Sequence, residues 1–167
     1  MAGGTHQRFT PRPEASSEAV TDMEYAAHTK KEGRRTLIEF PDCLGCATFA
    51  EAGEDIEAVA REALEAWLEA ELEGGDAPPR PSRAARRNKA LLVRVDPLLS
   101  VRLQLRWARQ DAGLSQSDLA KKVRVSRQQI SLLESPDANL RLSTLKRVAD
   151  ALGLELDISL EPRHTAA

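Results

Sequence analysis

Arg127 and Gln128 carry side chains well suited to specific recognition of another molecule. Their paired donors and acceptors fit bidentate hydrogen bonds to guanine O6/N7 and to adenine N6/N7 in the major groove of DNA. Ser131 and Leu132 follow within a helical turn, and they are left outside once their apolar neighbours are assigned to a buried face. The spacing therefore predicts a helix that presents these side chains to base edges. The alternative is a polar helix face that meets only solvent.

Two hydroxyl-acceptor pairs indicate where this helix and the preceding one begin. Ser115 stands three residues before Asp118, and Ser126 stands three residues before Gln129. This spacing is typical of a capping box, in which two side chains satisfy backbone N–H groups at the start of a helix. Residues 114–134 are therefore predicted to form two short helices joined by a tight turn. Their predicted inward faces are Leu119, Ala120, Val123, Ile130 and Leu133.

Cys43 and Cys46 form a CxxC pair, which raises the alternatives of redox chemistry and zinc binding. The pair flanks a Leu-Gly loop instead of starting a helix, and the chain has no second cysteine pair to complete a zinc site. The three histidines are scattered and show no grouping with a nucleophile. We therefore expect no catalytic residue, no metal and no cofactor, and we expect Cys46 to be a small buried side chain.

The net charge of −2 conceals an uneven distribution along the chain. Residues 1–22 carry −1, residues 23–76 carry −9 and residues 77–167 carry +8. This asymmetry favours a polyanion as the partner of the basic part and a basic molecule as the partner of the acidic part. The alternative for the acidic part is that its charges only keep the surface soluble.

An α/β unit is predicted in the acidic part. Residues 1–22 are polar and without periodicity, which predicts a disordered tail. Asp55 is expected to cap an amphipathic helix that ends at Gly74 and Gly75 and covers one face of a small sheet, and a Pro- and Arg-rich linker follows at residues 76–90. The predicted strands are residues 23–29, 35–40, 46–50 and 91–95, with a turn at residues 30–33 and the first three strands in an antiparallel meander.

A further helix and a strand are predicted near the C-terminus. Ser143 is expected to cap the helix and Gly153 to end it, while Asn139 and Arg141 lie in the preceding loop, from which they can reach a phosphate. Residues 154–160 alternate apolar and polar, which predicts a strand. That strand needs a partner, either the same strand of a second copy in a dimer or another part of its own chain.

The stretch LSQSDLAKKVRVSRQQISLLE, followed by NLRLSTLKRVADALGL, resembles the helix-turn-helix of the XRE and phage-repressor class over about residues 99–154. The resemblance implies that Gln116 contacts a phosphate. Arg124 stands where the turn usually carries glycine, and a positive φ there costs about 1 kcal/mol, so either the turn differs or a phosphate contact offsets the strain. The DNA-binding candidates are Gln116, Arg124, Ser126, Arg127, Gln128, Ser131, Leu132, Asn139 and Arg141.

The segment FPDCLGCATFAEAGEDIEAVAREALEAWLEAELE resembles the N-terminal domain of HicB-family antitoxins, over about residues 23–97. The matching motif residues are Phe40, Pro41, Asp42, Gly45 and Cys46. The resemblance implies a fold akin to part of RNase H and, as partner, a small basic RNA-cleaving toxin of the HicA kind. The candidates for the toxin contact are Asp42, Glu57, Glu65 and Glu69. Because these acids fall on one helix surface and in a loop, we expect no RNase H-like two-metal site.

Together these patterns predict an α+β protein. A small antiparallel ββ-β-α-β domain, partly RNase H-like, occupies residues 23–97, and an all-helical helix-turn-helix domain with a C-terminal strand occupies residues 98–162. The predicted function is that of a type II antitoxin, not an enzyme, which blocks its toxin and binds operator DNA as a homodimer or a tetramer. The alternative is a stand-alone transcription regulator whose N-terminal domain senses a ligand or drives oligomerisation. Without a signal sequence or membrane span, we expect a cytoplasmic location.

Overall fold

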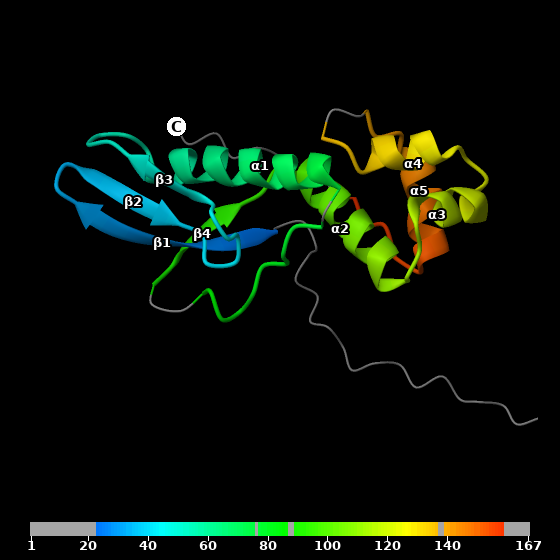
Figure 1. The fold of residues 1–167 in the computed structure, drawn as a ribbon, viewed down its shortest axis with the longest axis horizontal. Coiled ribbons are helices and arrows are strands. Elements are labelled where there is room, and N and C mark those ends of the chain that lie inside the picture. Colours follow the sequence, from blue (N-terminus) through cyan, green and yellow to red (C-terminus); the bar gives the residue numbers. More distant parts are fainter. Residues whose placement is uncertain (1–22, 76, 87–88, 137–138, 159–167) are drawn as a thin grey trace, which may run out of the picture.

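The computed structural model describes residues 23–75, 77–86, 89–136 and 139–158. A four-stranded antiparallel sheet and the long helix α1 lie at one end of an elongated molecule, and α3 to α5 lie at the other end with α2 between them (Figure 1). The fold is α+β, as the sequence predicts.

The sheet has the strand order β3-β2-β1-β4, so the predicted meander of the first three strands is confirmed. Its strands are β1 (Glu24–Glu32), β2 (Arg35–Glu39), β3 (Ala47–Ala50) and β4 (Leu91–Arg94). The predicted turn at residues 30–33 is wrong, because Lys30 pairs with Leu37 and Glu32 pairs with Arg35. The turn is instead a two-residue connection in which Gly33 has a φ of 64°, a conformation that glycine adopts without strain.

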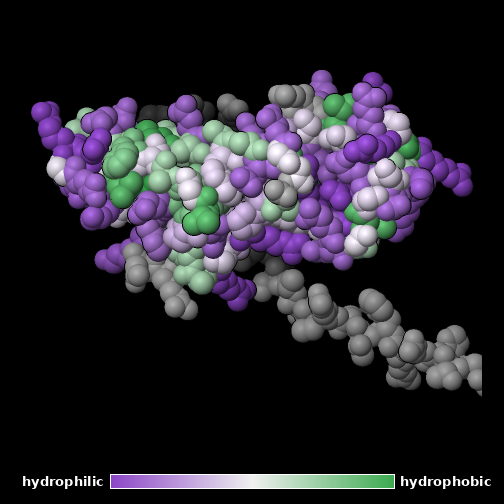
Figure 2. Space-filling view, viewed as in Figure 1, coloured by the Kyte–Doolittle hydropathy of each residue, from purple (hydrophilic) through white to green (hydrophobic). Residues whose placement is uncertain are grey.

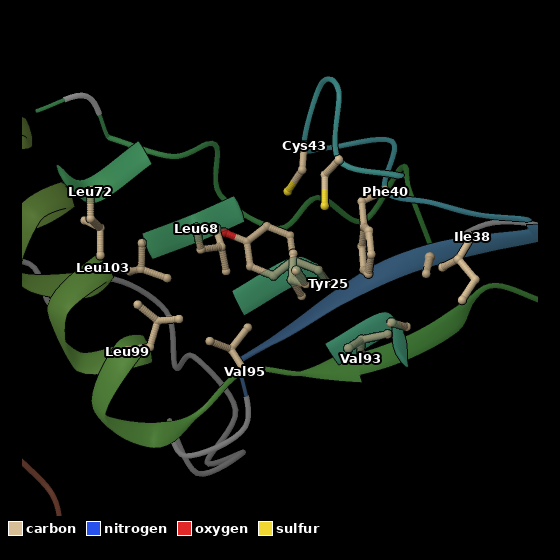
Figure 3. Close-up of a cluster of buried hydrophobic side chains, with 14 of the residues drawn as sticks. Tyr25, Ile38, Phe40, Cys43, Leu68, Leu72, Val93, Val95, Leu99 and Leu103 are labelled. Atoms are coloured by element: carbon tan, nitrogen blue, oxygen red, sulfur yellow. The ribbon is translucent and has the colours of Figure 1, made fainter. Parts of the chain in front are cut away.

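Helix α1 (Ile56–Gly74) covers one face of the sheet. The side chain of Asp55 accepts hydrogen bonds from the backbone N–H groups of Glu57 and Ala58, and Gly75 ends the helix with a φ of 93°, so both predicted boundaries are confirmed. The buried stripe of the helix is Ala60, Leu64, Leu68 and Leu72. Figure 3 shows Leu68 and Leu72 within the cluster that also contains Tyr25.

The FPDCLGC segment forms a closed loop between β2 and β3. The backbone N–H of Phe40 donates to the carbonyl of Cys46 at 3.1 Å, and that of Cys43 donates to the carbonyl of Phe40 at 3.0 Å. Both cysteines belong to the buried core of the sheet module, and Figure 3 shows Cys43 there. Burial raises the pKa of Cys43 to about 12 and that of Cys46 to about 11. Both side chains are therefore protonated at neutral pH and act here as small buried groups.

Residues 77–86 are packed against the sheet module and α2. The carboxylate of Asp42 accepts hydrogen bonds from the backbone N–H of Ser82 at 2.8 Å and from its hydroxyl at 2.7 Å. The indole N–H of Trp107, in α2, donates to the carbonyl of Pro78 at 2.7 Å. The Pro- and Arg-rich segment is thus a strap that joins the loop after β2 to α2.

Helix α2 contributes to two hydrophobic cores. Leu99, Leu103 and Trp107 belong to the core between the sheet and α1, whereas Leu105 belongs to the core of the helical module. Figure 3 shows the side chains of Leu99 and Leu103 in the same cluster as Leu72 of α1. The four C-terminal helices are α2 (Pro97–Asp111), α3 (Gln116–Val123), α4 (Arg127–Leu133) and α5 (Leu142–Leu152).

Two predictions for the C-terminal part are corrected. Helix α5 begins at Leu142 with Arg141 at the N-cap and without a side-chain cap, so Ser143 does not cap it. Residues 154–158 are not in a strand, while the rest of the predicted strand lies outside the described residues. Leu156 packs against the helical core instead, and Ile158 is 56% exposed. Within the described ranges, no helix is both long and apolar enough to cross a membrane.

Candidate nucleic-acid interface

Both predicted capping boxes are present at the starts of α3 and α4. The hydroxyl of Ser115 accepts from the backbone N–H of Asp118 at 3.1 Å, and a carboxylate oxygen of Asp118 accepts from the N–H of Ser115 at 3.2 Å. The pair of Ser126 and Gln129 repeats this exchange at 3.1 Å and 3.0 Å. Because each helix is only about two turns long, these caps define where it begins.

The turn between the two helices has the left-handed conformation at Arg124, with φ of 54° and ψ of 52°. The N–H of Val125 donates to the carbonyl of Ala120 at 3.0 Å, which is the bond of a Schellman motif. The usual turn geometry is therefore kept with arginine in the glycine position. Its strain costs about 1 kcal/mol, and its exposed side chain lies beside the start of α4.

The outer side of α4 presents the predicted base-contacting residues. Arg127, Gln128 and Ser131 are exposed, and Leu132 is 50% exposed, while Ile130 and Leu133 are buried. The face of α2 to α5 seen in Figure 2 is mostly hydrophilic, with more hydrophobic side chains over the sheet and α1. The structure thus separates a polar recognition face on α4 from its apolar underside, as the sequence predicts.

A buried ionic cluster holds α2, α3 and α4 together behind that face. Glu134, which is 2% exposed, accepts hydrogen bonds from Arg109 Nε at 2.6 Å and from Arg106 Nε at 3.2 Å. The amide of Gln116 donates to the same carboxylate at 3.1 Å. Gln116, the predicted phosphate contact, is therefore half-buried and oriented by Glu134 at the first position of α3.

The charge state of Glu134 follows from these contacts. Burial by itself raises the pKa of this carboxyl, but the hydrogen bonds from Arg109 and Gln116 and the charges of Arg109 and Arg106 outweigh it, so the pKa lies below its ordinary value. The sequence analysis missed this cluster. The signal was present in the helical spacing of Arg102, Arg106 and Arg109, which places three arginines on one face of α2.

Asn139 and Arg141 lie beside α4, the helix whose side chains are predicted to contact bases and which we call the recognition helix. Both line a cavity of about 420 Å³ between α4 and α5, together with Leu132, Thr144 and Arg147. The structure therefore brings these two loop residues next to the predicted base-contacting side chains, and it adds Arg147, which the sequence analysis did not single out.

The acidic candidates for a protein contact differ in their surroundings. Glu57 and Glu69 are exposed on α1, and Glu57 pairs with Arg61 at 2.7 Å. Asp42 is half-buried and holds the strap. Glu65 is half-buried and accepts a hydrogen bond from the backbone N–H of Asp96 at 2.8 Å. Two of the four candidates are thus exposed on α1, one of them paired with Arg61, and the other two are half-buried and hydrogen-bonded to other segments.

Comparison with known families finds one match within this part of the chain. The helix-turn-helix family matches residues 105–158, which run from the second half of α2 through α5. No curated protein matches the chain. The match and the exposed polar face of α4 indicate a DNA-binding transcription regulator that acts on double-stranded DNA.

Proposed function

We propose that this chain is the antitoxin of a type II toxin–antitoxin pair. In this proposal the sheet and α1 bind a small basic RNA-cleaving toxin of the HicA kind, and α3 and α4 of a homodimer bind operator DNA to repress the operon. The helix-turn-helix match supports the second half. The first half rests on the resemblance of the FPDCLGC segment and acidic helix to HicB-family antitoxins.

The exposed acidic side of α1 carries the proposal for the toxin contact. The buried stripe of α1 faces the sheet, and its glutamates at positions 57, 62, 69 and 73 are exposed. A toxin that grips RNA needs a basic surface, so an acidic helix is attracted to that surface and excludes the RNA from it. The same negative charge repels DNA. In this proposal the sheet and α1 therefore bind only the toxin, and α3 and α4 bind the DNA.

A regulator without a toxin is the second candidate. It is favoured by the extent of the family match, which covers residues 105–158 and leaves the sheet and α1 without a family match of their own. The neighbouring reading frames distinguish the two candidates. An adjacent frame for a small basic protein with a catalytic histidine favours the antitoxin, and its absence favours the regulator.

The proposal is tested by co-expressing the full chain with a tagged product of the neighbouring frame, followed by pull-down and mass spectrometry. The wild-type chain is expected to co-purify and to restore growth that the toxin alone arrests. A variant that carries Glu57→Gln and Glu69→Gln should bind more weakly, with the largest loss at low salt.

A variant that carries Glu39→Gln and Glu51→Gln is the matched control, because it removes the same two charges from exposed glutamates of the same module that lie outside α1. It should bind as the wild type does. Failure of any basic ribonuclease to co-purify would remove the toxin half of the proposal. If the control lost as much toxin binding as the α1 variant, the overall charge of the module would account for the binding, and the α1 surface would not be the contact.

A further inference from the structure

The C-terminal end of α1 approaches the helix-turn-helix from the side (Figure 1). A cavity of about 320 Å³ lies between them. Glu73 lines it from α1 and Gly75 from just beyond the end of that helix. Arg106 lines it from α2, and Gln116 and Ser131 line it from α3 and α4. The acidic helix thus ends beside two residues that are candidates for DNA contact.

The end of α1 is negative for two reasons. Glu71 and Glu73 lie in its last turn, which contains no basic residue. The backbone carbonyls at the end of a helix also carry a partial negative charge of about half an electron. Carboxylates at this position oppose the helix dipole, so Glu73 does not serve the stability of its own helix. Its side chain is exposed toward solvent.

The opposite wall has the character of a phosphate contact. Gln116 is the first residue of α3, and the backbone N–H groups at the start of a helix carry a partial positive charge. Ser131 is an exposed hydroxyl on the recognition helix. Because Glu73 lines the same cavity as Gln116, its carboxylate repels a phosphate that binds at Gln116.

We propose that Glu73 is an affinity-determining residue of the DNA interface, which holds the affinity of α3 and α4 for duplex DNA below the value that these helices alone would give. This inference rests on the proposed DNA binding. The N-terminal module thereby sets the strength of DNA binding without contacting a base.

The test compares Glu73→Gln with Glu62→Gln in the full chain. Glu62 is exposed on the same helix, eleven residues earlier, which is about three turns or about 16 Å away on the same side of α1. Both variants change the net charge equally. The probes are the duplex from immediately upstream of the gene and a random duplex of equal length, with dissociation constants measured by fluorescence anisotropy over a range of salt.

Glu73→Gln is expected to bind both duplexes about two- to fivefold more tightly at low salt, and the gain should disappear at high salt because the repulsion is screened. Glu73→Lys should enlarge the gain. Glu62→Gln should change the affinity much less. Because the expected result is a gain, a folding defect cannot imitate it.

Three outcomes separate the claims. If the wild type binds neither duplex, the proposed DNA binding itself fails. If the wild type binds but Glu73→Gln matches the wild type, this inference is overturned. If Glu62→Gln gains as much as Glu73→Gln, net charge accounts for the effect and the local role of Glu73 is overturned as well.

Discussion

Arg127 lies at the first position of α4 with its side chain exposed, next to the cap that Ser126 provides. A bidentate contact to a base edge is worth about 1–3 kcal/mol of discrimination. We therefore expect Arg127→Ala to lose that amount of binding free energy and to relax the preference at one base position. Anisotropy measurements against a set of singly substituted duplexes check this.

Gln116→Ala is expected to affect DNA binding in a different way from Arg127→Ala. Its amide is oriented by Glu134 at the start of α3, where a phosphate contact carries no sequence information. Its loss should weaken specific and random duplexes about equally. If Arg127→Ala and Gln116→Ala reduced binding to specific and random DNA in the same ratio, α4 would not be the recognition helix.

Glu134 makes the helical module sensitive to acid. Its pKa is lowered in the folded state from an ordinary value of 4.5, so the stability it contributes is complete above that value and is lost as the pH falls through the folded pKa. The free energy of unfolding should therefore decline below about pH 4.5. Urea unfolding at a series of pH values measures this decline.

Glu134→Gln is the matching variant for that measurement. It leaves Arg106 and Arg109 buried without their carboxylate, which costs about 3–5 kcal/mol when a buried pair is broken. The variant should be less stable at neutral pH and should depend less on pH in the acidic range. If the free energy of unfolding of the variant declined at acid pH as much as that of the wild type, other carboxyl groups would be the cause of the decline.

At the scale of elements, the turn at Arg124 combines strain with an exposed charge. Arg124→Gly should relieve up to about 1 kcal/mol of strain and raise the melting temperature. If the guanidinium contacts a phosphate, the same change should weaken binding to all duplexes and reduce the salt slope by about 1. Arg124→Lys keeps both the charge and the strained φ, and serves as the control. Unchanged DNA affinity in Arg124→Gly would exclude the phosphate contact.

Capping also explains which element boundaries could be predicted. Asp55, Ser115 and Ser126 bond to backbone groups two or three residues away, so their role is visible in a short stretch of sequence. Ser143 has the same residue type but lies inside α5, because the helix begins one residue earlier at Leu142. A serine caps a helix only where its own backbone is extended, as at Ser115 and Ser126, and the preceding loop determines that conformation.

At the scale of the whole molecule, α2 makes one folding unit of two modules. Leu103 is fully buried in the core shared with α1 and the sheet, so Leu103→Ala should cost about 2–5 kcal/mol. Both modules should still unfold in one transition, because the helix that carries Leu103 also carries Leu105 of the second core. Coincident melting curves from tryptophan fluorescence and far-UV circular dichroism check this.

Leu98→Ala is the control in the same helix, since Leu98 is 56% exposed and should change stability by less than about 0.5 kcal/mol. Two separate transitions in the wild type would contradict the shared core. The strap supports the same expectation, because Pro78 accepts a bond from Trp107 while Ser82 holds Asp42.

The sequence by itself determined the features that depend on neighbours within a few residues. These are the order of strands and helices in the sheet module, both capping boxes, the ends of α1 and the division of α4 into a buried and a polar side. Each follows from periodicity or from a cap, and both are local.

Only the tertiary structure decided what distant residues do to one another. Glu134 and Arg109 are 25 residues apart, Asp42 and Ser82 are 40 apart, and Tyr25 reaches the carbonyl of Pro79 across 54. The alternation at residues 154–158 satisfied the pattern of a strand, yet Leu156 found a place against the helical core. The periodicity of apolar side chains indicates which residues are buried. The packing of the whole chain determines which surface they are buried against.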